Sequence, residues 1–317
     1  RGFAYVSEGD VYFRVTKSNN YAKLANKTLE DLEIGASGRT DAETDRKEDP
    51  LDFALWKAAK EGEISWESPW GPGRPGWHIE CSVMATEILG DTIDIHGGGA
   101  DLEFPHHTNE IAQSEAKTGK TFANYWMHNG FVNVDNEKMS KSLGNFVTVH
   151  DMLKTVDGQV LRFFLATQQY RKPINFTEKA IHDAEVNLKY LKNTHSLPLT
   201  EEVSQAELQA YLDAFQAAMD DDFNTANGVT VLFDMAKWIN SGNYDETVKN
   251  AFEKILQVFG IVFEEETLDE DIEKLIEERQ AARANKDFAT ADRIRDELAA
   301  QGIKLLDTKE GVRWTRD

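Results

Sequence analysis

Cysteine and basic residues are scarce in this chain, and long apolar runs are missing. One cysteine in 317 residues excludes an internal disulfide and fits a reducing compartment such as the cytoplasm. Lys and Arg number 35 against 56 Asp and Glu, which gives a formal net charge of −21. This charge argues against indiscriminate nucleic-acid binding, which needs a basic surface. No stretch approaches the roughly 18–20 apolar residues of a membrane span. We therefore expect a cytoplasmic protein without a membrane partner.

The start of the sequence also lacks two common features. It has no initiator methionine, and residues 1–6 do not form the apolar stretch of a signal peptide. We therefore expect a chain that begins inside a longer protein. Its length predicts two or three domains, and a hydrophobic content of 40% with 10% aromatic residues is sufficient for a soluble core.

Acidic charge is unevenly distributed along the chain. Residues 201–271 hold 17 acidic and 3 basic residues, whereas residues 272–317 hold 10 of each. Residues 1–200 hold 29 acidic and 22 basic residues. Because a strongly acidic surface repels phosphates, contact with RNA is expected at the C-terminal segment rather than on the acidic segment before it.

Residues 77–110 contain the only cysteine, four of the eight histidines and a triple glycine. Pro105 can open a helix, since its missing N–H costs nothing in the first turn. On that helix His106 and Glu110 are four residues apart and leave the same face. With Cys81 they offer a thiolate, an imidazole and a carboxylate, which is a donor set for zinc that is one ligand short of a closed site. A buried free cysteine near an unrelated His–Glu pair is the alternative.

Residues 138–142 read Lys-Met-Ser-Lys-Ser. The two ammonium groups, Lys138 and Lys141, and the two hydroxyls suit a loop that contacts polyphosphate. A lysine-rich pentapeptide is, however, commonly only a solvated loop. The interpretation therefore depends on its neighbours.

Four segments of the chain, in their order and spacing, resemble the cysteinyl-tRNA synthetase family of class I aminoacyl-tRNA synthetases: GWHIEC, HGGGADLEFPHH, WMHNGFV and KMSKSLGNF. The resemblance extends from Arg1 to Arg316. The family begins with a nucleotide-binding half that carries a further zinc-ligand cysteine and a His-Ile-Gly-His motif, and these 317 residues contain neither. The resemblance implies an α/β Rossmann-like catalytic half, followed by an α-helical bundle and a small α+β C-terminal domain.

The resemblance also implies four segments. Residues 1–60 are the connective insertion between the catalytic halves. Residues 61–146 are the second half of the Rossmann-like catalytic domain, with the zinc site and the KMSKS loop. Residues 147–263 form the stem-contact and helical bundle domain, and residues 264–317 form an acidic linker and the C-terminal anticodon-binding domain.

Hydrophobic spacing and turn residues predict the individual elements. Strands are expected at residues 4–6, 11–15, 92–96, 125–128, 131–134, 303–306 and 312–314. The first two and the last two form hairpins, and residues 125–128 and 131–134 are expected as a strand pair. Helices are expected after Thr148, at 159–166, beyond Thr177, after Ser204, and over 226–236, 248–259, 272–286 and 289–301. Thr148 with Asp151 three residues on predicts a helix N-cap, Ser204 and Glu207 predict a capping box, and Gly260 predicts a helix C-cap.

The reaction implied by the resemblance is ATP-dependent activation of L-cysteine to cysteinyl-adenylate and transfer to tRNA(Cys). Cys81, His106 and Glu110 would bind one Zn²⁺ per chain. Zinc binds a thiolate and lowers the pKa of a thiol, whereas the hydroxyl of serine is much harder to ionise. Trp77 would line the substrate pocket. The implied partners are tRNA(Cys), L-cysteine and ATP with Mg²⁺, and we expect a monomer.

Two residues beside this ligand set, His107 and Thr108, could also affect metal binding. His107 is an alternative ligand, but the residue four positions further on is Ile111, so His106 is preferred. Thr108 replaces the glutamate that is usual in the family, and it lies off the expected ligand face.

The ATP contacts implied by the resemblance involve the lysine loop and the triple glycine. Lys138 and Lys141 would stabilise the charge that develops as pyrophosphate leaves, with Lys141 the more important of the two. Three glycines alone could be only a turn, but glycine also lets the backbone approach a nucleotide closely. The adenosine is expected at Gly97, Gly98, Gly99, Asp101 and His128, and Lys141 is expected at the phosphates.

The neutral C-terminal segment should read the anticodon with a few directed groups. Base edges are expected at Arg283, Asp292 and Asp307, and Phe288 or Trp314 would supply a stacking face. The alternative is a surface ion pair between Arg283 and Asp292, with both aromatic side chains in the core.

Two other functions remain open at this point. The cysteine ligase of mycothiol biosynthesis shares the zinc site and a KMSKS-type loop, but it has no anticodon domain, and residues 272–317 speak against it. A non-catalytic RNA- or zinc-binding fragment is the second alternative, because the first catalytic half is missing. By the same reasoning the chain alone is expected to be inactive.

Overall fold

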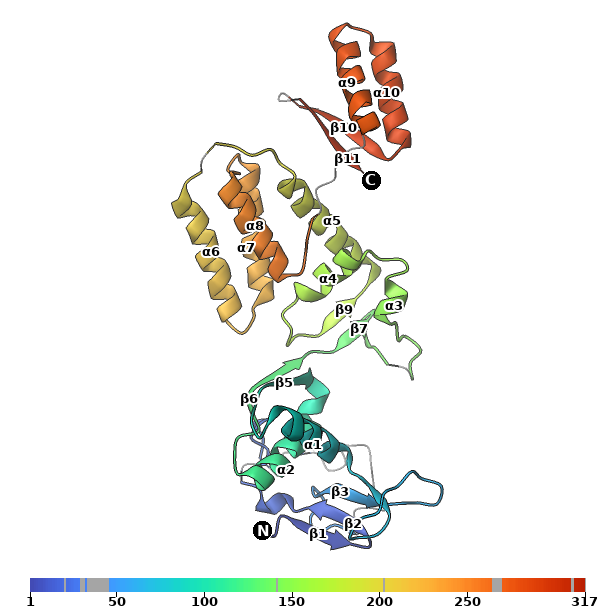
Figure 1. Ribbon diagram of the computed structural model, residues 1–317, viewed down its shortest axis with the longest axis vertical. Coiled ribbons are helices and arrows are strands. Elements are labelled where there is room, and N and C mark those ends of the chain that lie inside the picture. Colours follow the sequence, from blue (N-terminus) through green and yellow to red (C-terminus); the bar gives the residue numbers. More distant parts are fainter. Residues whose placement is uncertain are drawn as a thin grey trace. The chain divides into compact units, whose positions relative to one another are not determined.

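The computed structural model consists of two compact units, Arg1–Ile261 and Val262–Asp317 (Figure 1). The residues described are 1–19, 21–28, 32, 46–140, 142–201, 203–263, 270–308 and 311–316. Within these ranges, no helix combines the length and the apolar character that crossing a membrane requires.

An antiparallel sheet begins the first unit, with strand order β1 (Ala4–Ser7), β2 (Asp10–Phe13), β3 (Phe53–Ala58) and β4 (Gly73–Pro75). The predicted first hairpin is confirmed, since Ser7 pairs with Asp10 across the turn. The second strand is shorter than predicted. The N–H of Val15 donates to Asp52 Oδ1 at 2.8 Å and begins a short 3₁₀ turn, Val15–Lys17, instead of continuing the sheet.

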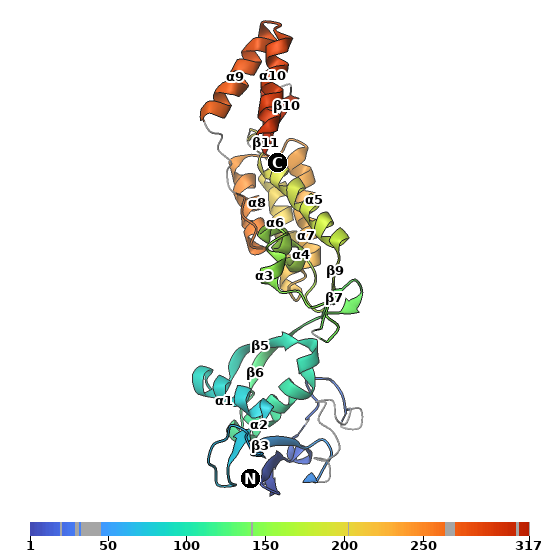
Figure 2. The ribbon, with the colours of Figure 1, turned by 90° about the vertical axis from the view of Figure 1, so that its right-hand side faces the viewer.

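A parallel pair of strands, β5 (Ile93–Gly99) and β6 (Ala123–Asn129), follows the helix α1 (Trp77–Leu89). The helix α2 (Thr108–Thr118) connects the two strands, and α1 and α2 lie beside them (Figure 2). The triple glycine is not a turn, because its residues pair with Met127–Asn129 as the end of β5. Both strands therefore end at the same edge, where α/β folds place their ligands.

The expected pairing of residues 125–128 with 131–134 is wrong. β7 (Val132–Val134) instead pairs with β8 (Glu137–Lys138) and β9 (Ile174–Phe176). Gly130 separates β6 from β7, and its N–H donates to the carbonyl of Tyr170 at 2.7 Å. The chain leaves one sheet and enters another at this glycine.

The start of α2 also differs from the prediction. Phe104 has an extended backbone (φ −138°, ψ 132°), and the following bond to Pro105 is cis. The wide turn Glu103–His107 is therefore kinked at Phe104, and its last residues lead into α2. His106 and Glu110 still lie on one face, as the four-residue spacing predicts.

The rest of the first unit is helical, as the apolar stripes predict. Its helices are α3 (Val149–Met152), α4 (Gly158–Ala166), α5 (Glu178–His195), α6 (Gln205–Asp220), α7 (Thr225–Asn240) and α8 (Glu246–Val258). Buried members of the stripes include Leu188, Leu191, Leu208, Phe215, Leu232, Phe252 and Ile255.

Two of the three predicted helix caps are confirmed. The hydroxyl of Thr148 accepts a hydrogen bond from the N–H of Asp151. Gly260 follows α8 with φ +69°, and the N–H of Ile261 bonds back to the carbonyl of Leu256, which is a Schellman ending. The capping box at Ser204 is wrong, since its side chain makes no cap hydrogen bond. The partner expected for it, Glu207, accepts from Trp238 Nε1 at 3.2 Å instead.

The second unit contains α9 (Glu270–Ala284), α10 (Phe288–Ala300) and a hairpin of β10 (Ile303–Thr308) and β11 (Gly311–Arg316). Both predicted helices and the predicted hairpin are confirmed. Its core consists of Ile272, Ile276, Ile294, Leu298 and Ile303. The predicted acidic linker lies mostly in residues 264–269, outside the described residues.

A substitution at Gly130 tests how closely the chain packs where it passes from β6 to β7. A methyl group added there would lie 2.4 Å from the carbonyl oxygen of Lys172 and 2.6 Å from the nitrogen of Pro173, so the backbone would have to move. We expect Gly130→Ala to lower the free energy of unfolding of the first unit by about 1–3 kcal/mol, as overpacking does. Thermal or urea unfolding measures this loss.

Gly158 is the matched control. A methyl group there would lie 3.5 Å from Leu153 Cδ2, an ordinary contact, in the first turn of α4. Gly158→Ala should be neutral or stabilising, because alanine favours helix more than glycine does. Equal unfolding curves for the two variants would contradict the close approach at Gly130.

Candidate functional site

Cys81, His106 and Glu110 converge where α1 meets α2. The Cys81 Sγ, a ring nitrogen of His106 and a carboxylate oxygen of Glu110 lie within 4.8 Å of one another. His106 Nε2 is 2.9 Å from Glu110 Oε1. The structure therefore brings together the three residues predicted as metal ligands, and only Cys81 comes from a different helix.

Glu110 is the most buried charged group of this cluster, with 0% exposure. Its Oε2 lies 2.7 Å from His96 Nε2, opposite His106. Burial raises the pKa of the carboxyl, but His106 and His96 outweigh burial and lower the pKa to about 2. Glu110 is therefore ionised at neutral pH.

The contacts of Glu110 fit a cation better than a set of hydrogen bonds. Among the described residues, neither of its buried carboxylate oxygens receives a hydrogen bond of good geometry, although both imidazole nitrogens lie within 3 Å. The ring nitrogens thus lie close to the carboxylate oxygens without a well-aligned N–H between them. Ligands around a bound metal ion have this arrangement, so the residues present fit a zinc ion.

The Cys81 thiol shows the same need for positive charge. Burial, together with the negative charge of Glu110, raises the pKa of Cys81 to about 11. The thiol is therefore protonated at neutral pH in the absence of a cation. A divalent cation between the two side chains would reverse this effect, because coordinating thiols lose their proton.

His106 is held on both sides. Its Nδ1 lies 2.9 Å from Nδ1 of His78, and its ring stacks on Trp77 with the centroids 4.4 Å apart. If His106 Nδ1 carries the proton shared with His78, then Nε2 keeps its lone pair toward Glu110 and Cys81. Trp77 is the first residue of α1 and is 43% exposed, so it can border a substrate.

A second group of histidines lies on the other side of Glu110. His96, His107 and Glu110 also place ligand atoms within 4.8 Å of one another. His107 Nδ1 is 2.8 Å from His128 Nε2. Burial lowers the pKa of His107 to about 4 and also lowers that of His128, so both rings are neutral at pH 7.

His106 is the histidine that lies with Cys81 and Glu110, but the spacing argument that preferred it to His107 was incomplete. It considered only the residue four positions further on, Ile111, but residues three positions apart also meet on a helix, and Glu110 is three positions from His107. Sequence reasoning also missed His78 and His96. The signal for His96 was its place at the end of the strand, immediately before the glycines.

The residues expected to border adenosine lie at the ends of the parallel strands. Gly98 pairs with His128, and Gly99 pairs with Asn129. A methyl group on Gly98 would lie 3.0 Å from Cε1 of His107, so the missing side chain makes room for this ring. Asp101 is exposed in the turn that follows β5, and His128 is 9% exposed.

The lysine loop begins at β8. Lys138 is exposed, and its Nζ lies 4.0 Å over the ring of Phe131. The N–H of Ser140 donates to Asn145 Oδ1 at 2.9 Å, which closes the loop. Lys141, the lysine expected to matter most, lies outside the described residues.

The second unit brings two of its predicted RNA contacts together. Asp307 accepts two hydrogen bonds from Arg279, both of 3.0 Å, and it also pairs with Arg283. These guanidinium groups, Arg279 first, hold the pKa of Asp307 below its ordinary value. Sequence analysis did not single out Arg279, although it lies four residues before Arg283 on one face of α9.

The alternative prediction, a surface ion pair between Arg283 and Asp292, is wrong. Asp292 pairs with Arg295 at 3.1 Å rather than with Arg283. It is also wrong for Phe288, which is 63% exposed. Trp314 does pack against the core of the unit, so of the two aromatic residues only Phe288 offers an open stacking face.

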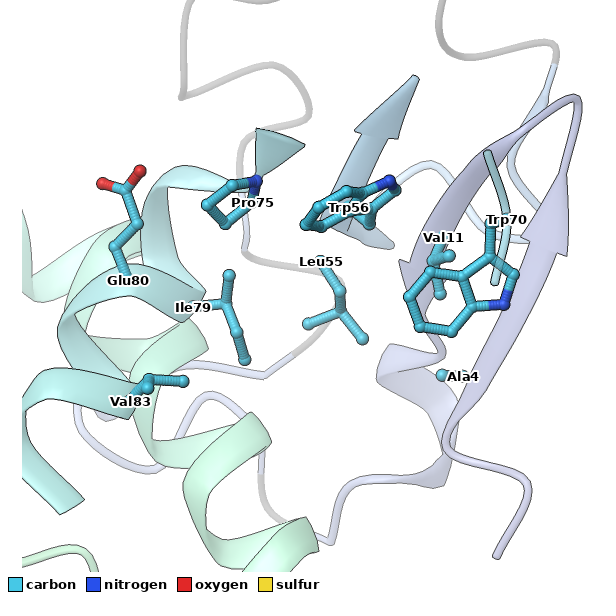
Figure 3. A pocket seen from close by; sticks show the side chains of 9 residues that line it. All are labelled: Ala4, Val11, Leu55, Trp56, Trp70, Pro75, Ile79, Glu80 and Val83. Carbon is cyan, nitrogen blue, oxygen red and sulfur yellow. The ribbon is translucent and has the colours of Figure 1, made fainter. Parts of the chain in front are cut away.

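An apolar cavity of about 480 Å³ separates α1 from the antiparallel sheet (Figure 3). Its lining residues are Ala4, Val11, Leu55, Trp56, Trp70, Pro75, Ile79, Glu80 and Val83. None of them belongs to the Cys81–His106–Glu110 cluster. The cavity therefore lies outside the polar site.

Family models match most of the chain. They are the tRNA synthetases class I (C) catalytic domain over residues 1–186, the DALR domain over residues 214–264, and the cysteinyl-tRNA ligase anticodon binding domain over residues 265–314. The last match supports neither alternative function, because it adds an anticodon-binding domain to a catalytic one.

Similar proteins agree with these models. The cysteine–tRNA ligase of Streptococcus thermophilus strain CNRZ 1066 is 99% identical over 317 residues, which is 100% of this chain and 71% of that protein. The cysteine–tRNA ligase of Streptococcus agalactiae strain 2603 V/R is 81% identical over 315 residues, 99% of this chain and 70% of that protein.

A solved structure with a similar fold is a putative arginyl-tRNA synthetase from Campylobacter jejuni, with a TM-score of 0.51 and 14% identity. The match covers 84% of this chain and 59% of that one, and it bears on the fold alone. The predicted class I synthetase fold, with its catalytic, helical and C-terminal parts, is confirmed. From these matches, together with the Cys-His-Glu cluster and the lysine loop, it follows that the chain belongs to the cysteine–tRNA ligase family.

Proposed function

We propose that Cys81, His106 and Glu110 hold one zinc ion, which this protein uses to recognise L-cysteine before joining it to tRNA(Cys). The observation that carries the proposal is the buried, ionised Glu110, whose oxygens face ring nitrogens without well-aligned hydrogen bonds. When bound, zinc supplies a Lewis acid that stabilises a thiolate far better than an alkoxide. Cysteine is thereby separated from serine by chemistry rather than by shape.

The residues around the ligands prepare them for this role. His96 faces the second oxygen of Glu110 and keeps the carboxylate ionised and oriented. His78 faces Nδ1 of His106 and fixes the tautomer whose Nε2 can bind a metal. Trp77 covers the face of His106 and limits the access of water beside the expected thiol position.

The ATP contacts belong to the same proposal. Lys138 and Lys141 bind the phosphates of ATP, which enters with Mg²⁺, and stabilise the charge on the departing pyrophosphate. Gly97, Gly98, Gly99, Asp101 and His128 border the adenosine. The position of the glycines at the C-terminal edge of β5 supports this assignment.

Recognition of tRNA(Cys) is assigned to the second unit. Arg283, Asp292 and Asp307 would contact base edges, and Phe288 would supply the stacking face in preference to Trp314. The match to an anticodon-binding model over residues 265–314 supports this assignment. A cytoplasmic location and a monomeric state stay predictions.

The first test concerns zinc. We expect about one zinc per protein chain, and Cys81→Ala should lose it, because a thiolate is the softest of the three ligands. Metal analysis after gel filtration measures the content. Retention of full zinc occupancy in Cys81→Ala would rule out this ligand set. Cys81→Ser should also lose zinc, since its hydroxyl ionises so much less readily.

The second test concerns the lysine loop. Lys141→Ala should slow adenylate formation by ~10²-fold or more and leave cysteine binding nearly unchanged, as expected for a group that acts in the transition state. Stopped-flow measurement of adenylate formation in the complete enzyme separates the two effects. A raised Kd for cysteine with an unaltered rate of activation would contradict this role.

The third test concerns the anticodon. Arg283→Ala should reduce kcat/KM for tRNA(Cys) by about 1–3 kcal/mol, the scale of one good base contact, without changing cysteine activation. Asp307→Ala should show the same loss, but it also leaves the buried Arg279 unpaired and destabilises the unit. Arg283→Ala is therefore the cleaner variant.

The matched control is Arg293→Ala, an exposed arginine of the same unit that pairs with Glu297. It should charge tRNA(Cys) like the wild-type protein. If Arg283→Ala and Arg293→Ala behave alike, or if an anticodon-mutant tRNA is charged as well as the cognate one, this unit does not read the anticodon through Arg283.

A further inference from the structure

The candidate metal ligands lie on two helices that no covalent link holds at a fixed spacing. Cys81 belongs to α1, whereas Glu110 belongs to α2 and His106 lies in the turn that leads into it. Metal–ligand distances tolerate deviations of only about 0.2 Å. Some contact between the helices must therefore set the separation of Cys81 and Glu110.

Gln113 makes such a contact. It lies three residues after Glu110 and seven after His106, on the same face of α2, and it is 5% exposed. Its side-chain amide Nε2 donates to the carbonyl oxygen of His78 at 2.6 Å and to Ser82 Oγ at 2.7 Å. Both amide hydrogens thus bind α1.

Ser82 continues the connection back to α2. Its hydroxyl donates to the backbone carbonyl of Glu110, at a long 3.4 Å. Ser82 is the neighbour of Cys81 in the sequence and is 4% exposed. A polar chain therefore runs from Gln113 through Ser82 to Glu110 and ties the ligand-bearing turn of α1 to the ligand-bearing turn of α2.

The side-chain oxygen of Gln113 does not stabilise the fold. Its Oε1 is buried and, among the described residues, has no hydrogen-bond partner. The orientation of the amide is fixed nevertheless, because the carbonyl of His78 can only accept. A buried polar atom without a partner is unfavourable, and an apolar side chain of similar volume would fill this space without that loss.

We propose that Gln113 is a positioning residue for the metal site, which sets the distance between Cys81 and Glu110 by binding the first turns of α1 through His78 and Ser82. This inference rests on the proposed zinc site. Gln113 touches neither substrate nor metal, and it acts only through the two helices.

Cobalt binding tests the proposal, because Co²⁺ replaces zinc and its absorption spectrum reports ligand geometry. The variants are Gln113→Met, which keeps the volume and removes both hydrogen bonds, and Gln113→Glu, which keeps the shape and removes the two donors. The matched control is Asn240→Leu. It removes another amide, which links α7 to α5 by donating to Thr194 Oγ1 and also donates to the carbonyl of Ala236 in its own helix.

We expect both Gln113 variants to bind Co²⁺ about 10–100-fold more weakly, as loss of an outer-shell partner typically does, and to shift the visible absorption bands. Asn240→Leu should unfold at a lower temperature with the affinity and the spectrum unchanged. Wild-type affinity and spectrum in Gln113→Met, with only a lower unfolding temperature, would overturn the proposal.

Two further variants keep the result decisive. If Gln113→Met does not fold, Ser82→Ala removes the connection to Glu110 and should shift the spectrum in the same direction, and an unchanged spectrum there overturns the proposal. Cys81→Ala should bind no Co²⁺. If the wild-type protein binds none either, the zinc site itself is wrong and the inference fails with it. If the wild-type protein binds Co²⁺ and Gln113→Met binds it equally well, the metal site stands and only the positioning role of Gln113 is wrong.

Discussion

The polar site of this protein depends on one buried carboxylate. Glu110 carries a full charge at 0% exposure, a state that is costly unless opposite charge or directed donors surround it. His106 and His96 approach its two oxygens from different elements, the turn before α2 and the strand β5. The turn and the strand must therefore keep fixed positions relative to α2. Gly98 has no side chain at the position where one would strike His107, so it lets a third ring pack behind the carboxylate.

The same carboxylate explains the chemistry of the cysteine. A thiol beside a buried negative charge resists ionisation, and the pKa of Cys81 rises to about 11. The cluster thus holds two groups, the Glu110 carboxylate and the Cys81 sulfur, that a nearby positive charge would stabilise. A divalent cation satisfies both groups at once. A site that depends on thiolate affinity in this way also suits a substrate defined by its thiol, because the chemical difference from a hydroxyl is much larger than the difference in size.

Local patterns in the sequence predicted the parts of the structure that depend on residues close together in the chain. The spacing of His106 and Glu110, the cap at Thr148 and the apolar stripes of α5 to α8 all hold. The failures depend on residues far apart. His96 reaches Glu110 only through the pairing of β5 in a sheet, and Glu207, the expected partner in the Ser204 capping box, instead accepts from Trp238 of another helix. In the sequence, Gln113 has the character of a surface residue on a polar helix. Its burial depends on α1, which packs against it in the folded protein.

The second unit uses its charges in a different way. Arg279 is buried and occupies both oxygens of Asp307, so this pair fixes the hairpin against α9. Arg283 shares the same carboxylate, but its side chain is 45% exposed. An exposed ion pair contributes about 0–1 kcal/mol, whereas a bidentate contact to a base contributes about 1–3 kcal/mol. Exchange of Asp307 for a base edge would therefore be favourable for Arg283, while Arg279 would still neutralise the carboxylate left behind. If Arg283 reads a base as proposed, a unit with no net basic charge binds RNA through one exposed guanidinium group and one exposed ring, Phe288.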